Sequence, residues 1–177
     1  MTTAPDGRPP ALLLGPDHAA WIGKGISAIV ASRDAQRQPS LMRAVGADVG
    51  AQGERVTVYL NRLAARQVLA DLEATGQIAV VFSEPSSHRT LQVKASRVDM
   101  RPAEAADAPL LQRYLRGMEW QLHQVGITPH QVRTMLSHRL SDVVAVSFAP
   151  EQAFDQTPGR SAGARIGVAP PASGALP

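Results

Sequence analysis

Cysteine is absent from this 177-residue chain, and its absence removes several kinds of chemistry at once. Without a thiol there can be no disulfide framework, no thiol nucleophile and no cysteine-bound zinc or iron–sulfur cluster. The lack of cysteine also fits a reducing compartment.

Long apolar runs and runs of like charge are missing as well. The segment A-L-L-L (11–14) is too short for a signal-peptide core or a membrane span, so we expect a soluble, cytoplasmic protein with no membrane partner. The formal net charge is only +3, and sixteen arginines and two lysines are scattered along the chain. No stretch could follow a phosphate backbone, so nucleic acid is not an expected partner.

Metal-site spacing and nucleophile motifs are lacking too. No two of the five histidines have the i, i+4 spacing of a helical metal site, so no metal ligand is predicted. No serine stands in a context that marks a nucleophile. The catalytic residues therefore stay unknown.

The length of the chain predicts one domain with a single core. Residues 1–10 contain three prolines and a glycine, and we expect them to be disordered. We expect a single domain over 11–163 and a flexible tail over 164–177, which is rich in Gly, Ala and Pro.

The apolar pattern is mainly that of strands. Val56, Val58 and Leu60 alternate with polar residues, and residues 78–82 are continuously apolar, as in a buried strand. The expected strands cover 26–32, 40–49, 55–61, 78–82, 90–100 and 143–148. Helices are expected over 62–76, 105–125 and 128–139. Six short strands with peripheral helices describe a small, mainly β, antiparallel barrel.

The start of the first of these helices is a candidate anion site. Asn61 can cap the helix, and a helix N-terminus attracts anions through its unpaired N–H groups and its dipole. Arg62 and Arg66 lie one turn apart there, and Arg43 on a neighbouring strand could add a contact to the same phosphate. The alternative is a solvated Arg66 that pairs with Asp71 or Glu73.

Residues 26–100 resemble the pyridoxamine 5′-phosphate oxidase-like superfamily of FMN-binding split barrels. The resemblance rests on R-A-V (43–45), V-Y-L-N (58–61) before the helix, and L-Q-V-K (91–94). The segment F-D-Q-T-P-G (154–159) is similar to the closing segment of an uncharacterised subgroup. The resemblance implies a six-stranded antiparallel split β-barrel and a homodimer with flavin sites between its subunits.

Ten residues are the candidate FMN contacts: Arg43, Ala44, Val45, Asn61, Arg62, Arg66, Gln92, Lys94, Gln156 and Thr157. The resemblance matches six of them by position, namely Arg43, Ala44, Val45, Asn61, Arg66 and Gln92. In this comparison Arg43 contacts the flavin, while Ala44 and Val45 offer backbone groups toward its ring. Asn61, Arg62 and Arg66 belong to the phosphate cluster. Gln92 faces the cofactor.

Lys94 shares the face of Gln92 and could supply charge near the flavin. Gln156 and Thr157 reach across the dimer to cover the site. Each has an alternative: Gln92 could make a cross-strand hydrogen bond, Lys94 could protect an edge strand, and 157–159 could be a simple turn.

The sequence also departs from the true oxidases of the superfamily. Asp48 stands where those enzymes have a lysine, the cluster before the helix is reduced to Ala64, Ala65 and Arg66, and no C-terminal substrate-binding arginine segment is present. We therefore expect an FMN-dependent oxidoreductase of unknown small-molecule substrate, and not a pyridoxamine phosphate oxidase. The alternatives are a non-catalytic flavin- or ligand-binding dimer and a haem-binding split barrel, each with a degenerate cofactor site.

Overall fold

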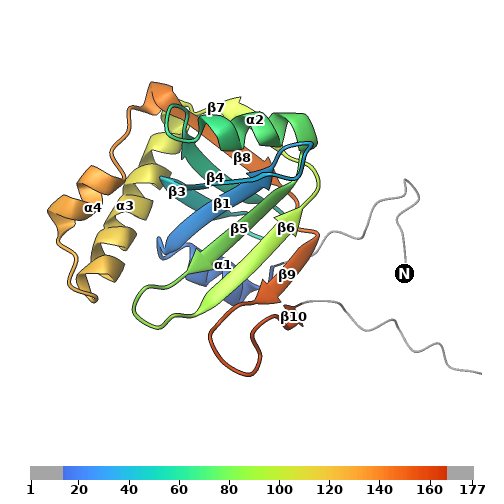
Figure 1. The fold of residues 1–177 in the computed structure, drawn as a ribbon. Coiled ribbons are helices and arrows are strands. Elements are labelled where there is room, and N and C mark those ends of the chain that lie inside the picture. Colours follow the sequence, from blue (N-terminus) through green and yellow to red (C-terminus); the bar gives the residue numbers. More distant parts are fainter. Residues whose placement is uncertain (1–13, 167–177) are drawn as a thin grey trace, which may run out of the picture.

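The computed structural model describes residues 14–166 and folds them into two antiparallel sheets with helices at their periphery (Figure 1). The strands are β1 (Ser27–Arg33), β2 (Pro39–Arg43), β3 (Gly46–Val49), β4 (Val56–Asn61), β5 (Ile78–Ser83), β6 (Thr90–Ala95), β7 (Asp99–Pro102), β8 (Val143–Phe148), β9 (Gln152–Asp155) and β10 (Arg165–Ile166). The helices are α1 (Pro16–Ile22), α2 (Arg66–Thr75), α3 (Ala108–His123) and α4 (Pro129–Met135), with short 3-10 turns η1 (Ala105–Asp107) and η2 (Leu140–Asp142).

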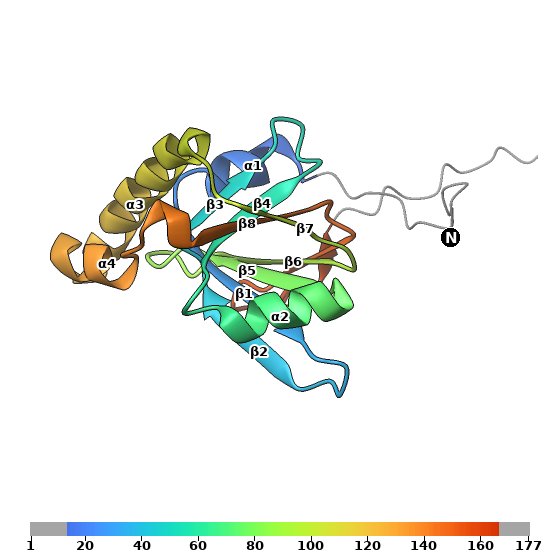
Figure 2. The same cartoon turned by 90° about the horizontal axis from the view of Figure 1, so that it is seen from above.

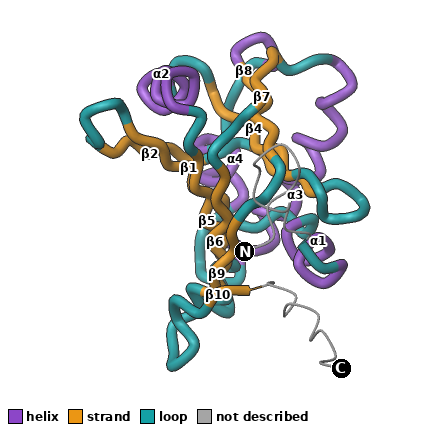
Figure 3. The backbone as a smooth tube through the Cα atoms, turned by 90° about the vertical axis from the view of Figure 1, so that its right-hand side faces the viewer, coloured by secondary structure: helices purple, strands orange, loops and turns teal. Residues whose placement is uncertain are grey.

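The two sheets form two layers around one core. The large sheet has the strand order β10-β9-β6-β5-β1-β2 and the small sheet β3-β4-β8-β7. Figure 3 shows the strands of the large sheet in one layer and β4, β7 and β8 in the other. Alternate residues such as Val30, Phe82, Val58 and Phe148 are buried between the layers. The mainly β, antiparallel class is confirmed, whereas the barrel of six strands is corrected: residues 14–166 form ten strands in two sheets that do not close.

The predicted strand 40–49 is in fact two strands in different sheets. The Ala44 amide donates to the Ala28 carbonyl in the large sheet at 2.9 Å, and the Val45 amide donates to the Tyr59 carbonyl in the small sheet at 2.8 Å. The chain therefore changes sheets between these two residues. Both sides of the change are buried, so the apolar pattern continues through it.

The predicted strand 90–100 divides in the same way. β6 ends at Ala95 in the large sheet, and β7 begins at Asp99 in the small sheet. The expected bulge at Ser96 and Arg97 is the connection between the sheets.

Two of the helix signals in the sequence are found at the predicted residues. Gly76 follows α2 with a left-handed φ of 67°, and Thr128 caps α4 in a capping box with Gln131. Helix α1 was not predicted. In Figure 2, α3 and α4 lie together at one side of both sheets. No helix within residues 14–166 is long and apolar enough to cross a membrane.

The folded domain continues past the predicted boundary at residue 163. Arg165 and Ile166 pair with Phe154 and Ala153, so β10 extends the large sheet into the segment predicted as a flexible tail. The disorder predicted for 1–10 lies outside the described residues. So do residues 11–13 of the predicted domain and residues 167–177 of the predicted tail.

Candidate functional site

The outer face of the large sheet carries a row of side chains that includes two predicted flavin contacts. Arg43 of β2 lies opposite Ile29 of β1, and Ile29 lies opposite Val81 of β5. Val81 lies opposite Gln92 of β6, and Gln92 opposite Phe154 of β9. We call these five residues the central row. Neighbouring strands are about 4.8 Å apart, which places the Arg43 and Gln92 backbones about 14 Å apart.

Arg43 is held in this row by a hydroxyl group. Its Nη1 atom donates a hydrogen bond of 2.7 Å to the Ser27 Oγ atom. Within residues 14–166, no carboxylate forms an ion pair with Arg43. A guanidinium has five N–H donors, and the described residues leave most of this hydrogen-bonding capacity to an anionic ligand.

Ala44 and Val45 lie at the point where the chain changes sheets, directly after Arg43. Both residues are buried, and the amides of both are already bonded within the sheets. Neither N–H group is free for a flavin ring in this arrangement. Their carbonyl groups are the remaining backbone atoms for the predicted contact.

Lys94 lies two residues beyond Gln92, on the same outer face of β6. Both side chains are half-buried, while Leu91, Val93 and Ala95 point to the core. The Lys94 ammonium lies 5.0 Å from the centre of the Phe154 ring, a cation–π distance. This contact places the positive charge beside the end of the central row.

Asn61 caps a turn rather than the helix itself. Its Oδ1 atom accepts hydrogen bonds from the Leu63 amide at 3.0 Å and the Ala64 amide at 3.2 Å. Helix α2 begins only at Arg66, four residues later than the predicted start at residue 62.

The structure brings Arg62 and Arg66 together with Arg101 of β7. The three side chains line a surface groove of about 450 Å³ between α2 and strands β7 and β8, and Glu73 also lines it. Arg43 does not line this groove. Helix α2 packs against β1 and β2 on their inner face, whereas Arg43 is on the outer face. The predicted phosphate cluster is thus divided by the edge strand β2.

The alternative partner of Arg66 is engaged elsewhere. Asp71 is buried and accepts hydrogen bonds from Ser40 Oγ at 2.5 Å and from Gln67 Nε2 at 2.8 Å. Within the described part of the chain, neither Arg62 nor Arg66 forms an ion pair.

Asp48, which stands at the lysine position of the oxidases, is paired with another residue. Its carboxylate lies 3.2 Å from Arg113 Nη2 of α3. Burial nevertheless raises the pKa of the Asp48 carboxyl above its usual value, and Arg113 opposes this shift. Its charge therefore has a partner on α3.

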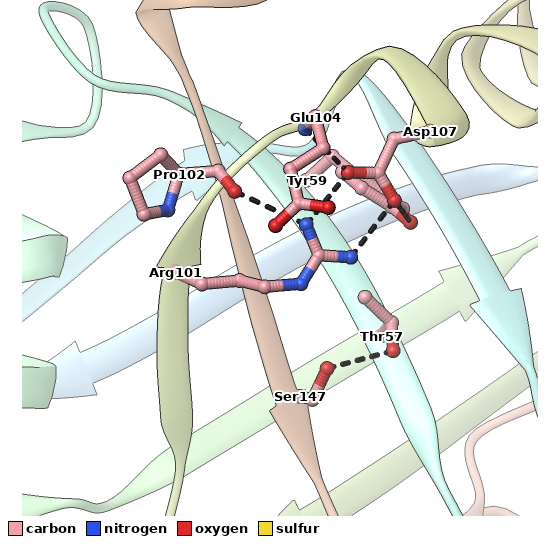
Figure 4. A network of polar contacts seen from close by, with 7 residues as sticks. All are labelled: Thr57, Tyr59, Arg101, Pro102, Glu104, Asp107 and Ser147. Atoms are coloured by element: carbon pink, nitrogen blue, oxygen red, sulfur yellow. Dashed lines mark hydrogen bonds and ion pairs between the residues drawn. The ribbon is translucent and has the colours of Figure 1, made fainter.

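A second polar centre, which the sequence reading missed, surrounds Asp107 (Figure 4). Arg101 holds the Asp107 carboxylate with two hydrogen bonds of 2.7 and 2.9 Å. The Tyr59 hydroxyl donates to the same carboxylate at 2.9 Å, and the Glu104 amide at 2.8 Å. Glu104 and Asp107 have the three-residue spacing of a capping box, which is a signal that the sequence does contain.

Gln156 and Thr157 border the central row within their own subunit. The Gln156 amide donates to the Thr90 carbonyl at 2.8 Å, and the Thr90 amide donates to Thr157 Oγ1 at 3.0 Å. Thr90 is two residues before Gln92 on β6. Hydrogen bonds from Thr157 also lower the pKa of the Asp155 carboxyl. The reach of these residues across a dimer stays a prediction.

No cluster of three or more His, Asp or Glu side chains that could hold a metal ion occurs among residues 14–166. The central row and the neighbouring Lys94 instead offer groups that suit an organic ligand: the Arg43 guanidinium, the Gln92 amide and the Lys94 ammonium beside aliphatic and aromatic side chains.

Comparison with known proteins identifies the fold. No family model and no curated protein matches the chain. Among solved structures it is similar to an F420 reductase, with 16% identity over 79% of this chain and 96% of the other, at a TM-score of 0.53. The HupZ protein of group A Streptococcus is 14% identical over 85% and 100% of the two chains, with a TM-score of 0.52. A candidate pyridoxamine 5′-phosphate oxidase of Lactobacillus delbrueckii is 12% identical over 80% and 93%, with a TM-score of 0.51.

At these identities the likeness concerns the fold. The chain has the fold of the split-barrel proteins that include pyridoxamine 5′-phosphate oxidase-like enzymes, so the resemblance found in the sequence is confirmed at that level.

Proposed function

We propose that this protein is a cytoplasmic homodimer that binds FMN on the outer face of its large sheet and acts as an oxidoreductase on a small molecule. The observation that carries the proposal is the central row. It places on one sheet face an amide and a guanidinium that has no carboxylate partner within residues 14–166, with aliphatic side chains between them.

The side chains of the row match the chemistry of a flavin. Ile29 and Val81 offer an apolar surface to the flat ring, and Gln92 offers both a donor and an acceptor to its polar edge. Arg43 supplies a positive charge for the phosphate or another anionic part. Bound FMN would supply the electron or hydride transfer, while the protein binds and orients it.

The predicted phosphate contacts to Arg62 and Arg66 require the cofactor to pass the edge strand β2. This edge is open, because β2 is the last strand of the large sheet. Substitution of Arg66 therefore tests whether the FMN phosphate extends past β2 to the start of α2. Substitution of Arg43 tests the contact on the outer face of the sheet.

A dimer with no turnover is the second candidate. The Ala44 and Val45 amides are hydrogen-bonded within the sheets, and no acid, base or nucleophile stands out among the described residues of the outer face. Both features fit a protein that carries a flavin or another ligand without a reaction.

The visible absorption spectrum of the protein tests these candidates, before and after incubation with FMN and desalting. We expect one flavin per subunit and its reduction by a nicotinamide nucleotide. Reduction only with reduced F420 would favour a deazaflavin partner, and a Soret band would place haem ahead of flavin. Bound flavin without reduction by either donor would favour the second candidate.

Substitutions locate the site. We expect Arg43→Ala and Arg66→Ala each to weaken FMN binding tenfold or more, because a hydrogen bond to a charged group contributes about 1.5–3 kcal/mol. Arg55→Ala is the matched control, since Arg55 makes an exposed ion pair with Asp99 away from the row. Wild-type FMN affinity in both test variants would contradict the site.

A further inference from the structure

A second recess lies beside the central row on the same face of the large sheet. Two residues further along the strands, Ala31, Ala79, Lys94 and Gln152 lie opposite one another in a parallel row. The surface is lower at this row, because the small side chains of Ala31 and Ala79 occupy the positions that Ile29 and Val81 have in the central row. The resulting groove has a volume of about 420 Å³, within the range of small-molecule sites.

Two positive charges stand at the rim of this groove. Arg33 is oriented by a 3.0 Å hydrogen bond from its Nε atom to Gln77 Oε1 and by a 3.1 Å bond from Nη1 to the Asp34 carbonyl. Lys94 is placed by its contact with the Phe154 ring. Within residues 14–166, neither cation forms an ion pair with a carboxylate.

One negative charge lines the groove as well. Glu151 accepts a 2.7 Å hydrogen bond from Ser96 Oγ, which turns one carboxylate oxygen toward that hydroxyl. Among the described residues, the charged lining side chains are thus Arg33, Lys94 and Glu151, with a net charge of +1. A small floor of methyl groups below two cations is complementary to an organic anion with a flat or narrow apolar body.

We propose that this groove binds the acidic group of the substrate, a carboxylate or a phosphate ester, and that Arg33 and Lys94 determine this specificity. The inference rests on the proposed flavin site, because residues two apart on a strand are about 7 Å apart and the groove therefore adjoins the central row. An anion held by Arg33 and Lys94 would direct its apolar part over Ala31 and Ala79, toward the ring position.

Titration with benzoate, phenyl phosphate and benzylamine, followed by backbone amide NMR shifts, tests the proposal. The measurement is made on the full chain with and without FMN, so that it does not depend on flavin uptake. We expect benzoate or phenyl phosphate to shift the amides of Ala31, Ala79, Lys94 and Gln152, and the stronger of the two identifies the acidic group. Benzylamine should leave these amides unshifted.

Two variants and one control decide the role of the charges. Lys94→Met and Arg33→Met should each weaken binding of the anionic probe about tenfold, since each loses a charged contact. Arg116→Met removes an exposed charge from α3 and should leave the affinity unchanged. Equal affinity for benzylamine, or unchanged anion affinity in both test variants, would overturn the inference. If the protein takes up no flavin but the probes behave as expected, the flavin proposal fails and the anion groove stands.

Discussion

At the scale of single residues, the Asp107 carboxylate is the clearest case of a charge stabilised by its surroundings. Four hydrogen bonds, from Arg101, Tyr59 and the Glu104 amide, converge on it. The Arg101 guanidinium first, and then the Glu104 amide and the Tyr59 hydroxyl, hold the pKa of Asp107 well below its usual range against the effect of burial. The network joins β7 and the start of α3 to β4.

Asp107→Asn should therefore destabilise the protein by about 2 kcal/mol at pH 7. The asparagine NH2 group is itself a donor and cannot accept the hydrogen bonds that Arg101 and the Glu104 amide donate to the carboxylate. The pKa of the Asp107 carboxyl is lower in the folded protein than in the unfolded chain, where it is about 3.9. The ionised carboxylate therefore stabilises the fold fully above about pH 3.9. This stabilisation is lost as the pH falls from there through the pKa of the folded state. Urea unfolding from pH 7 to pH 3 should show the difference between wild type and variant shrinking only below about pH 4.

Asp99→Asn is the control for this prediction. Asp99 pairs with Arg55, but its side chain is 78% exposed, and such pairs contribute about 0.2–1 kcal/mol. Equal losses of stability in the two variants would show that burial of the Asp107 network is unimportant.

Strand alternation alone predicts that Gln92 and Lys94 share one sheet face, as they do on β6. That Arg43 of β2 lies on the same face depends on how the strands pair. The relation of Arg66 to Arg43 could not be predicted in this way. The helix begins after an Asn61-capped turn, and α2 then packs on the opposite face from Arg43.

At the scale of elements, two glycines that face each other let helix α3 pack closely against the segment before β1. Gly25 has a φ of 76°, and a Cβ atom on it would lie 2.7 Å from the Tyr114 carbonyl oxygen and 2.9 Å from the Gly117 Cα. A Cβ atom on Gly117 would overlap the Lys24 carbonyl. The backbones of α3 and of the segment before β1 therefore touch directly.

Gly117→Ala tests this contact, because the close approach decides whether the free energy of unfolding falls or rises. In an isolated helix the change would stabilise by about 1 kcal/mol, but overlap with backbone atoms costs about 1–3 kcal/mol or more. We expect a net loss of about 2 kcal/mol in urea unfolding. The adjacent exposed site provides the control, because Arg116→Ala should stay within about 0.5 kcal/mol of wild type. A more stable Gly117→Ala variant would contradict the close approach.

The element boundaries show what a local pattern could not reveal. Residues 40–49 and 90–100 are each mostly extended, so sequence reading joined them into single strands. The change of sheet at Ala44 and Val45 depends on which partner strand accepts each amide, and those partners, Ala28 and Tyr59, are distant in sequence. Local helix signals such as Gly76 and the Thr128 capping box carry no such dependence and were predicted correctly.

At the scale of the whole molecule, the outer face of the large sheet is left uncovered by the described helices (Figure 1). The centre of this face is apolar: its half-buried side chains include Ile29, Ala31, Ala79 and Val81, and the side chain of Leu41 on β2 is 66% exposed. An antiparallel sheet with an apolar outer face is stabilised when a second layer covers it. A second copy of the chain is the layer that we propose, which would also enclose the central row.

Leu41→Glu should therefore convert the proposed dimer into a monomer. Leu41 lies opposite Ala31, next to the floor of the groove, so Leu41→Glu removes an exposed apolar side chain from the proposed interface and puts in its place a charge whose desolvation in the dimer is costly. Light scattering after size-exclusion chromatography gives the mass, and circular dichroism checks that the variant is folded.

Leu63→Glu is the matched control, because Leu63 is 69% exposed but lies in the turn before α2. A monomeric wild-type protein, or a dimeric Leu41→Glu variant, would refute this interface. If the flavin site lies between subunits, the monomeric variant should also lose FMN, whereas Leu63→Glu should retain both its mass and its colour.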